Sequence, residues 1–209
     1  MKTCSLVAKK GGVGKSAIAT NTAVCAAADG YSVAIIDLDP QASACVWADV
    51  RDADPDVPTV PVTSIAPSRL QSALDKCSAA GIDLVIIDTA PSADSGLLAA
   101  AKAGDICLLP SKPGLADLSA LSDTVELLRN SRAKGATVLN MVATKSLKIE
   151  GTKALEGLGF PVVPVSIWQR VAWGHAYSGG WGVIEYDPTG KAANEMKQLW
   201  IWIKKQLEM

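Results

Sequence analysis

The chain has 209 residues, of which 49% are hydrophobic and 20% charged, and its formal net charge is −1 at pH 7. This composition excludes a disordered chain and can fill one sizeable core, while five scattered cysteines without a CxxC pair and a single histidine argue against a disulfide framework, a zinc site and a Ser-His-Asp triad. The near-zero charge leaves any nucleic-acid binding to a local basic patch, and without an apolar run of roughly 18 residues we expect a cytoplasmic protein.

Short apolar runs alternate with helical stretches along the chain. We predict strands over residues 4–8, 32–36, 60–63, 83–88, 106–110, 137–144 and 162–167. We predict helices over residues 17–28, 69–80, 115–132, 150–158 and 194–207, and a surface connection over residues 51–68. Because alternating strands and helices form a mainly parallel, twisted sheet with helices on both faces, we expect an α/β fold, with residues 1–209 as a single domain.

The stretch KGGVGKS, residues 10–16, lies between the first predicted strand and the first predicted helix. In that order the backbone N–H groups of residues 12–16 point inward and can cradle a phosphate at the positive end of the helix. Lys15 would neutralise the β- and γ-phosphate oxygens, and the Ser16 hydroxyl would bind Mg²⁺. The predicted nucleotide-binding residues are Lys10, Gly11, Gly12, Val13, Gly14, Lys15, Ser16 and Ala17.

Acidic residues end two of the predicted strands. Asp88 ends the strand over residues 83–88, where the Walker B acid of P-loop enzymes holds the metal directly or through water. Asp37 and Asp39 alternate on an extended stretch, so their side chains point to opposite faces unless the chain is already turning. We therefore expect Asp37 and Asp39 to have different roles.

Four stretches together resemble one family. KGGVGKS, DLDPQ at residues 37–41, IIDTAP at residues 86–91 and YDPTGKAAN at residues 186–194 are similar to the ParA/MinD family of deviant Walker ATPases, in particular its small ParA type. This resemblance implies the single-domain P-loop NTPase fold, an ATP and Mg²⁺ requirement, and an ATP-dependent homodimer that hydrolyses ATP slowly. Ala17 departs from the pattern, because the family usually has a threonine there that contacts the α-phosphate.

The resemblance also assigns roles to single residues. It implies that Lys10 reaches the phosphates of the partner subunit, while Lys15 acts in its own subunit. It implies that Asp39 orients the attacking water and that Ser16, Asp37 and Asp88 form the magnesium shell. The adenine site is expected from residues 110–113 and 167–170, with Arg170 as a nucleotide-binding residue.

In the leading functional hypothesis, the ATP dimer binds DNA without sequence preference and is associated with the nucleoid. A centromere-binding or adaptor protein stimulates hydrolysis, so that a plasmid, a chromosome or another cargo is partitioned. The DNA-binding candidates are Lys191, Lys197, Lys204 and Lys205, together with Arg129, Arg132, Lys134, Lys145 and Lys148.

Two other functions belong to different classes. QLWIWIKKQL, residues 198–207, would form a helix with one apolar face, and such an interfacial helix would support a membrane-associated positioning function of the MinD kind. A core-docked last helix is the plainer interpretation of the same pattern. A biosynthetic ATP-dependent enzyme of this P-loop branch would need an additional substrate domain, for which the length leaves no room.

Overall fold

A single parallel sheet organises the chain, and the computed structural model describes residues 1–91 and 94–209. Its six strands run in the order β3-β2-β4-β1-β5-β6, and every neighbouring pair is parallel. The strands are β1 (Lys2–Leu6), β2 (Val33–Asp37), β3 (Val62–Ser64), β4 (Leu84–Asp88), β5 (Ile106–Ser111) and β6 (Gly135–Leu139). The predicted α/β fold is confirmed.

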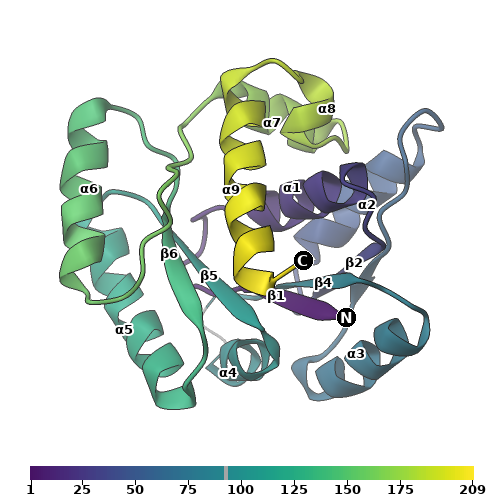
Figure 1. Cartoon of the computed structure of the whole chain (residues 1–209), viewed down its shortest axis with the longest axis horizontal. Coiled ribbons are helices and arrows are strands. Elements are labelled where there is room, and N and C mark those ends of the chain that lie inside the picture. The colour runs from purple at the N-terminus through teal and green to yellow at the C-terminus, as the bar shows by residue number, and fades with distance from the viewer. Residues whose placement is uncertain (92–93) are drawn as a thin grey trace.

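Helices cover both faces of this sheet (Figure 1). They are α1 (Lys15–Ala28), α2 (Ser43–Asp52), α3 (Leu70–Ala79), α4 (Asp94–Ala103), α5 (Leu115–Ser131), α6 (Lys145–Gly157), α7 (Val171–Ser178), α8 (Val183–Tyr186) and α9 (Lys191–Leu207). One core joins α1, α2 and α9 to the sheet, and two cores on the opposite face join it to α3, α4, α5 and α6. Within residues 1–91 and 94–209, no helix is long and apolar enough to span a membrane.

The neighbouring strands β2 and β4 are apolar up to their last residue because both of their faces are covered. Along β4, Ile86 faces the core of α1 and α9, whereas the next residue, Ile87, faces the core of α3. All five residues of β2 and of β4 are buried. Since burying a Val, Leu or Ile side chain contributes about 1.5–3 kcal/mol, a run of such residues holds the strand in the middle of three layers.

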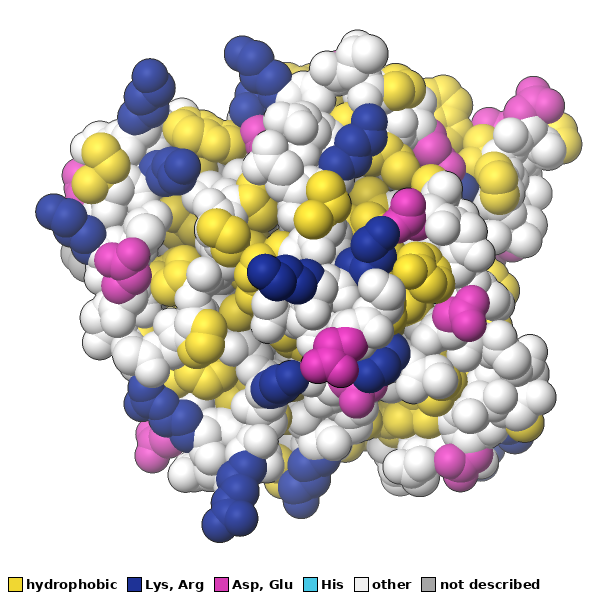
Figure 2. All heavy atoms as spheres, in the orientation of Figure 1, with side chains coloured by type: hydrophobic (Ala, Val, Ile, Leu, Met, Phe, Trp, Pro, Cys, Tyr) yellow, Lys and Arg dark blue, Asp and Glu magenta, His cyan; other side chains and the backbone are white. Residues whose placement is uncertain are grey.

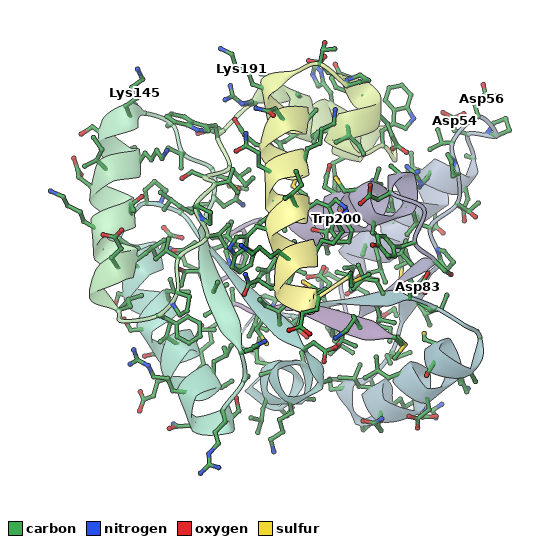
Figure 3. The ribbon with its side chains drawn as sticks, viewed as in Figure 1. Asp54, Asp56, Asp83, Lys145, Lys191 and Trp200 are labelled. Atoms are coloured by element: carbon green, nitrogen blue, oxygen red, sulfur yellow. The ribbon has the colours of Figure 1, made fainter. Side chains whose placement is uncertain are left out.

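The apolar face of α9 packs on the core. Met196, Leu199 and Ile203 are fully buried, and the Trp200 indole donates a 3.0 Å hydrogen bond to Asp29 at the end of α1. Figure 3 shows Trp200 between α9 and the elements behind it. The face of residues 198–207 that would enter a membrane surface is therefore occupied by the protein's own core, in line with the plainer interpretation of this segment.

Two predicted strands differ from the observed ones. Residues 162–167 form no strand in the structure: Val162 makes an isolated bridge to Thr137 on β6, and the next bridge, of Trp168 to Val142, lies beyond both segments. Pro161 and Pro164 explain this, because proline has no N–H to donate to a ladder. The strand predicted over residues 137–144 ends at Leu139, where Asn140 begins the turn that brings it beneath the glycine loop.

Four helices were not predicted as such: α2, α4, α7 and α8. On α2 the buried residues Ala44, Trp47, Ala48 and Arg51 do recur at helical spacing, but Arg51 is charged and the apolar Val46 and Val50 are exposed, so the sequence shows no clear apolar face. The surface connection predicted over residues 51–68 begins inside α2, and the short strand expected within it, over residues 60–63, corresponds to β3.

A buried arginine fastens α2 to α8. The Arg51 side chain is 1% exposed and donates to both carboxylate oxygens of Glu185, at 2.9 and 2.7 Å, and to the carbonyls of Pro58 and Gly180. Gly180 has φ +72°, and a Cβ there would overlap the backbone of Arg51. This contact requires glycine at position 180.

We predict that Gly180→Ala lowers the free energy of unfolding by more than about 2 kcal/mol, because left-handed strain adds to a backbone clash. The matched control is Gly81→Ala, with φ +75° and no atom within 4 Å of the added Cβ, which should cost only about 1 kcal/mol. Urea denaturation of both variants measures the difference. Equal losses in the two variants would show that the Arg51 contact does not constrain position 180.

Candidate nucleotide-binding site

The glycine loop between β1 and α1 has the geometry of a phosphate cradle. Gly12 and Gly14 have φ of +69° and +90°, which favours glycine. A Cβ on Gly14 would overlap the Asn140 side chain, whose amide nitrogen donates a 2.7 Å hydrogen bond to the Val13 carbonyl. Gly14 also begins α1, and no side chain caps that helix end. The first N–H groups of α1 are therefore left for an anion.

Lys15 is aimed into this loop. Its side chain is buried, and its ammonium lies 3.5 Å from the Lys10 carbonyl oxygen. Burial lowers the pKa of Lys15, and the negative charges of Asp88 and Asp39 partly oppose that shift. A buried ammonium at the mouth of a glycine loop is suited to neutralising phosphate oxygens.

Two buried carboxylates lie side by side at the ends of β2 and β4. Asp37 and Asp88 are paired in the strand register and both are 0% exposed. Asp37 accepts hydrogen bonds from the backbone N–H groups of Asp39 at 2.9 Å and Ala44 at 3.0 Å. Burial raises the pKa of Asp37, and these backbone donors oppose the rise. Asp37 thus shapes the loop that follows it.

Asp88 is the less satisfied of the two acids. Neither of its oxygens has a hydrogen-bond partner among the described residues. Burial raises the pKa of Asp88 to about 7; the nearby Ser16 hydroxyl and Lys15 ammonium lower it in part, and Asp37 raises it further. Buried, unsatisfied carboxylate oxygens next to a hydroxyl fit a cation with its water shell.

The donor set fits magnesium bound together with a nucleotide. Within the described residues there is no cluster of three or more His, Cys, Asp or Glu side chains that could hold a metal. Mg²⁺ is usually held by one or two carboxylates, several waters and the phosphates of a substrate, and Ser16, Asp37 and Asp88 offer that limited set. These residues fit the predicted metal site, and the phosphates would supply the remaining ligands.

Asp39 occupies a different environment from Asp37. It is half-exposed on the loop before α2, and its carboxylate accepts the N–H of Gln41 at 2.9 Å. Its charge is close enough to affect Lys15. The pattern Asp-x-Asp therefore delivers one buried acid and one accessible acid, which agrees with the expectation of different roles.

A cavity of about 170 Å³ lies beside the start of α1. Its lining residues are Ala17, Ile18, Asn140, Met141, Trp168, Gln169, Arg170 and Trp173. The Trp173 indole nitrogen is buried and has no partner among the described residues. Arg170 is held by Glu195 on α9 through its Nε at 2.9 Å. The position suits the base of a nucleotide whose phosphates lie on the glycine loop.

The sequence predicted only some of the residues that line this cavity. Residues 168–170 line it as expected, whereas residues 110–113 lie at the end of β5 and are not among its described lining residues. It missed Asn140 and Trp173, which follow β6 and start α7. Nothing in the local sequence of either residue shows that it meets the glycine loop or α1.

The Lys10 side chain reaches to α5. Its ammonium pairs with Asp117, in the first turn of α5, at 2.9 Å, and the side chains are 36% and 13% exposed. The two lysines of the motif thus occupy separate environments in one chain. The action of Lys10 on a partner subunit stays a prediction.

The predicted DNA-binding lysines lie on or near the outer face of α9. Lys191 and Lys205 are exposed and form no ion pair within the described residues, whereas Lys204 pairs with Asp29 at 2.6 Å and Lys197 donates to the Pro188 carbonyl. Lys145 and Lys191 project outward from the starts of α6 and α9 (Figure 3). Figure 2 shows basic side chains over the left and centre of this face, around α6 and α9.

A glycine loop at a helix start, a buried lysine and two strand-end carboxylates define a P-loop nucleotide-binding protein. The chain belongs to the CobQ/CobB/MinD/ParA nucleotide-binding family, whose sequence model matches residues 4–179. MinD and ParA members of this family are ATPases. The resemblance found in the motifs is therefore confirmed.

Three known proteins illustrate the similarity. Maintenance of carboxysome distribution protein A from Halothiobacillus neapolitanus is 30% identical over 207 residues, covering 94% of each chain. MinD from Pyrococcus horikoshii, complexed with Mg-ADP, has a TM-score of 0.81 at 16% identity, covering 98% of this chain and 96% of that one. An ATP complex of a McdA variant from Cyanothece has a TM-score of 0.75 at 16% identity, covering 100% and 97%.

We predict that Asp88 makes the nucleotide-free protein less stable as the pH rises. An unfolded aspartate titrates near pH ~4, so between about pH 4 and 7 the folded chain binds the extra proton. Stability should fall through that window, by up to about 4 kcal/mol, and level off above it. Asp88→Asn should remove the Asp88 share of this slope, leaving the smaller share of Asp37, whose pKa burial also raises, and should exceed the wild-type stability at about pH 8.

Urea denaturation without magnesium or nucleotide across this pH range tests the prediction. Asp123→Asn, on the exposed side of α5, is the matched control and should keep the wild-type slope. An unchanged slope in Asp88→Asn would assign the pH dependence to other groups.

Proposed function

We propose that this chain is an ATP-dependent positioning switch that dimerises on ATP and Mg²⁺, binds DNA without sequence preference, and distributes a cargo through an adaptor protein. The observation that carries the proposal is the separation of Lys15 and Lys10, one buried in its own phosphate loop and the other outside it. The similarity to a protein named for carboxysome distribution supports a positioning role. The cargo class includes plasmid or chromosomal DNA and protein-bound cargo.

The site residues have different roles in ATP hydrolysis. The loop N–H groups and Lys15 bind and orient the phosphates, and Ser16, Asp37 and Asp88 hold the ion. Bound Mg²⁺ would neutralise charge that develops on the phosphate oxygens. Asp39, the accessible acid, orients the attacking water. Phosphoryl transfer needs mainly positioning and charge stabilisation, so hydrolysis stays slow until all of these groups are aligned.

Lys10 makes dimerisation depend on the nucleotide. Two ATP molecules brought face to face repel one another, and a cation supplied by each partner offsets that repulsion. In the single chain the Lys10 ammonium pairs with Asp117, and such a partly exposed ion pair is worth at most about 1 kcal/mol. Phosphate groups of a partner would therefore displace Asp117 at little cost.

We predict that Lys10→Ala still binds ATP but no longer dimerises on it, because it keeps Lys15 and the loop but lacks the cation supplied in trans. Equilibrium dialysis of ATP and analytical ultracentrifugation with ATP and Mg²⁺ measure the two properties. The matched control is Lys9→Ala, the neighbouring lysine, which should dimerise like the wild type. ATP-dependent dimers of Lys10→Ala would refute the trans role.

DNA binding is assigned to the exposed lysines of α9, whose apolar face is already used by the core. A dimer doubles the phosphate contacts that one nearly neutral chain can offer, so affinity should require ATP and fall steeply with salt. In the cell, this ATP form would lie on the nucleoid within the cytoplasm.

We predict that Lys191→Glu with Lys205→Glu weakens ATP-dependent DNA binding by about tenfold or more, because lost phosphate contacts release fewer counterions. The control, Arg69→Glu with Lys76→Glu, changes the charge equally on the opposite face of the sheet and should stay within about threefold of wild type. Fluorescence anisotropy with duplex DNA measures both, and sedimentation with anionic liposomes runs in parallel. Liposome binding without DNA binding would favour a membrane-associated function instead.

A further inference from the structure

Helix α2 begins four residues after Asp39, and its start is held by two different groups. The Ala44 N–H donates to the Asp37 carboxylate at 3.0 Å, and the Ser43 carbonyl accepts a 2.8 Å hydrogen bond from the Tyr177 hydroxyl. Tyr177 lies on α7, more than a hundred residues away in the sequence. Both contacts lie where the loop that carries Asp39 joins α2, and the Asp39 N–H nearer its start also donates to Asp37, at 2.9 Å.

The far end of α2 is fixed to the same region of the chain. The Trp47 indole donates to the Trp181 carbonyl at 3.3 Å, and Arg51 pairs with Glu185. With these contacts α2 lies against α7 and α8 along its length. A shift of α7 relative to the sheet would therefore be passed to the start of α2.

The Tyr177 hydroxyl is suited to this contact. Burial raises the pKa of Tyr177 to about 12, and the negative charges of Asp88 and Asp37 add to the rise. The hydroxyl is therefore protonated and available as a donor wherever the protein is folded near neutral pH. Because the charges of Asp37 and Asp88 affect this pKa, the Tyr177 hydroxyl lies near these two strand-end acids.

Helix α7 connects this contact to the cavity of about 170 Å³ beside the start of α1, which we call the base cavity. Trp173 lines that cavity and precedes Tyr177 by four residues, so both side chains lie on one side of α7. One helix face thus meets the base cavity with Trp173 and the start of α2 with Tyr177.

We propose that Tyr177 is a positioning residue for hydrolysis, which holds the Asp39 loop in place through the Ser43 carbonyl. This inference rests on the proposed role of Asp39. Tyr177→Phe removes a hydroxyl that bonds the Ser43 carbonyl and replaces no residue of the phosphate loop, the metal-binding acids or the cavity lining, so we expect it to affect turnover and not nucleotide affinity.

The test compares Tyr177→Phe with Tyr186→Phe. Tyr186 belongs to the neighbouring helix α8, and its hydroxyl meets the exposed His175 at 3.0 Å, so the control loses the same group away from α2. We expect Tyr177→Phe to lower kcat about five- to tenfold, which is the fold-change for one lost hydrogen bond. Its KM for ATP, its ATP-dependent dimerisation and its thermal midpoint should stay close to those of the control. Tyr186→Phe should keep wild-type kcat. A parallel loss of ATP affinity or thermal stability in Tyr177→Phe would overturn the proposal in favour of a structural role.

The double variant Asp39→Ala with Tyr177→Phe tests the role of Tyr177 separately from the role of Asp39. If Tyr177 acts through the Asp39 loop, adding Tyr177→Phe to Asp39→Ala should lower kcat by less than about twofold further. A full additional five- to tenfold loss would overturn the proposal, as would normal kcat in Tyr177→Phe beside slow Asp39→Ala. Normal turnover of Asp39→Ala itself would overturn the role of Asp39 and this inference with it.

Discussion

Two carboxylates buried next to each other, at the ends of β2 and β4, impose the main constraint on this molecule. Asp37 and Asp88 are adjacent in the strand register and fully buried, and like charges at such a place disfavour ionisation. The two acids are satisfied to different extents. Asp37 accepts hydrogen bonds from backbone N–H groups, whereas Asp88 has the Ser16 hydroxyl and the Lys15 ammonium nearby, and its two oxygens have no hydrogen-bond partner in the part of the chain that the structure describes. Asp88 can therefore accept a cation. Its pKa of about 7 shows that the nearby groups offset only part of the cost of burying its charge.

The surrounding elements can be understood from this constraint. The loop after β2 folds over the Asp37 carboxylate, which sets where α2 begins and how Asp39 is presented. The glycine loop brings Lys15 to the same place from β1, which lies beside β4. Asn140, from the end of β6, braces the loop through the Val13 carbonyl. Contributions from four strands therefore converge at one edge of the sheet, as is usual for parallel α/β proteins.

Local sequence was sufficient for the parts that local chemistry determines. The glycines with positive φ, the lysine and serine at the start of α1, and the acids that end apolar strands all stand in short, readable patterns. Helix α2 was missed because Val46 and Val50 point to solvent while Trp47 points inward, and the strand expected over residues 162–167 failed at two prolines. Asn140, Asp117 and Tyr177 owe their positions to tertiary contacts with residues about 100 positions away or more, and no pattern around them carries that information.

The amphipathic pattern of the last helix is compatible with a membrane-surface helix and with a helix docked on the core, and the packing distinguishes between them. The residues that could enter a membrane surface, Leu199 and Trp200 among them, are buried against α1, and of the large apolar side chains on α9 only Ile201 is largely exposed. Apart from Ile201 and the half-buried Trp202, the side chains that α9 leaves to solvent are polar or basic. On a chain of net charge −1, a few such lysines are weak ligands for a polyanion, since each phosphate contact adds only one released counterion. A second copy joined through the nucleotide would double those contacts at once, so a change at the phosphate site would become a change in binding at a surface that the nucleotide never touches.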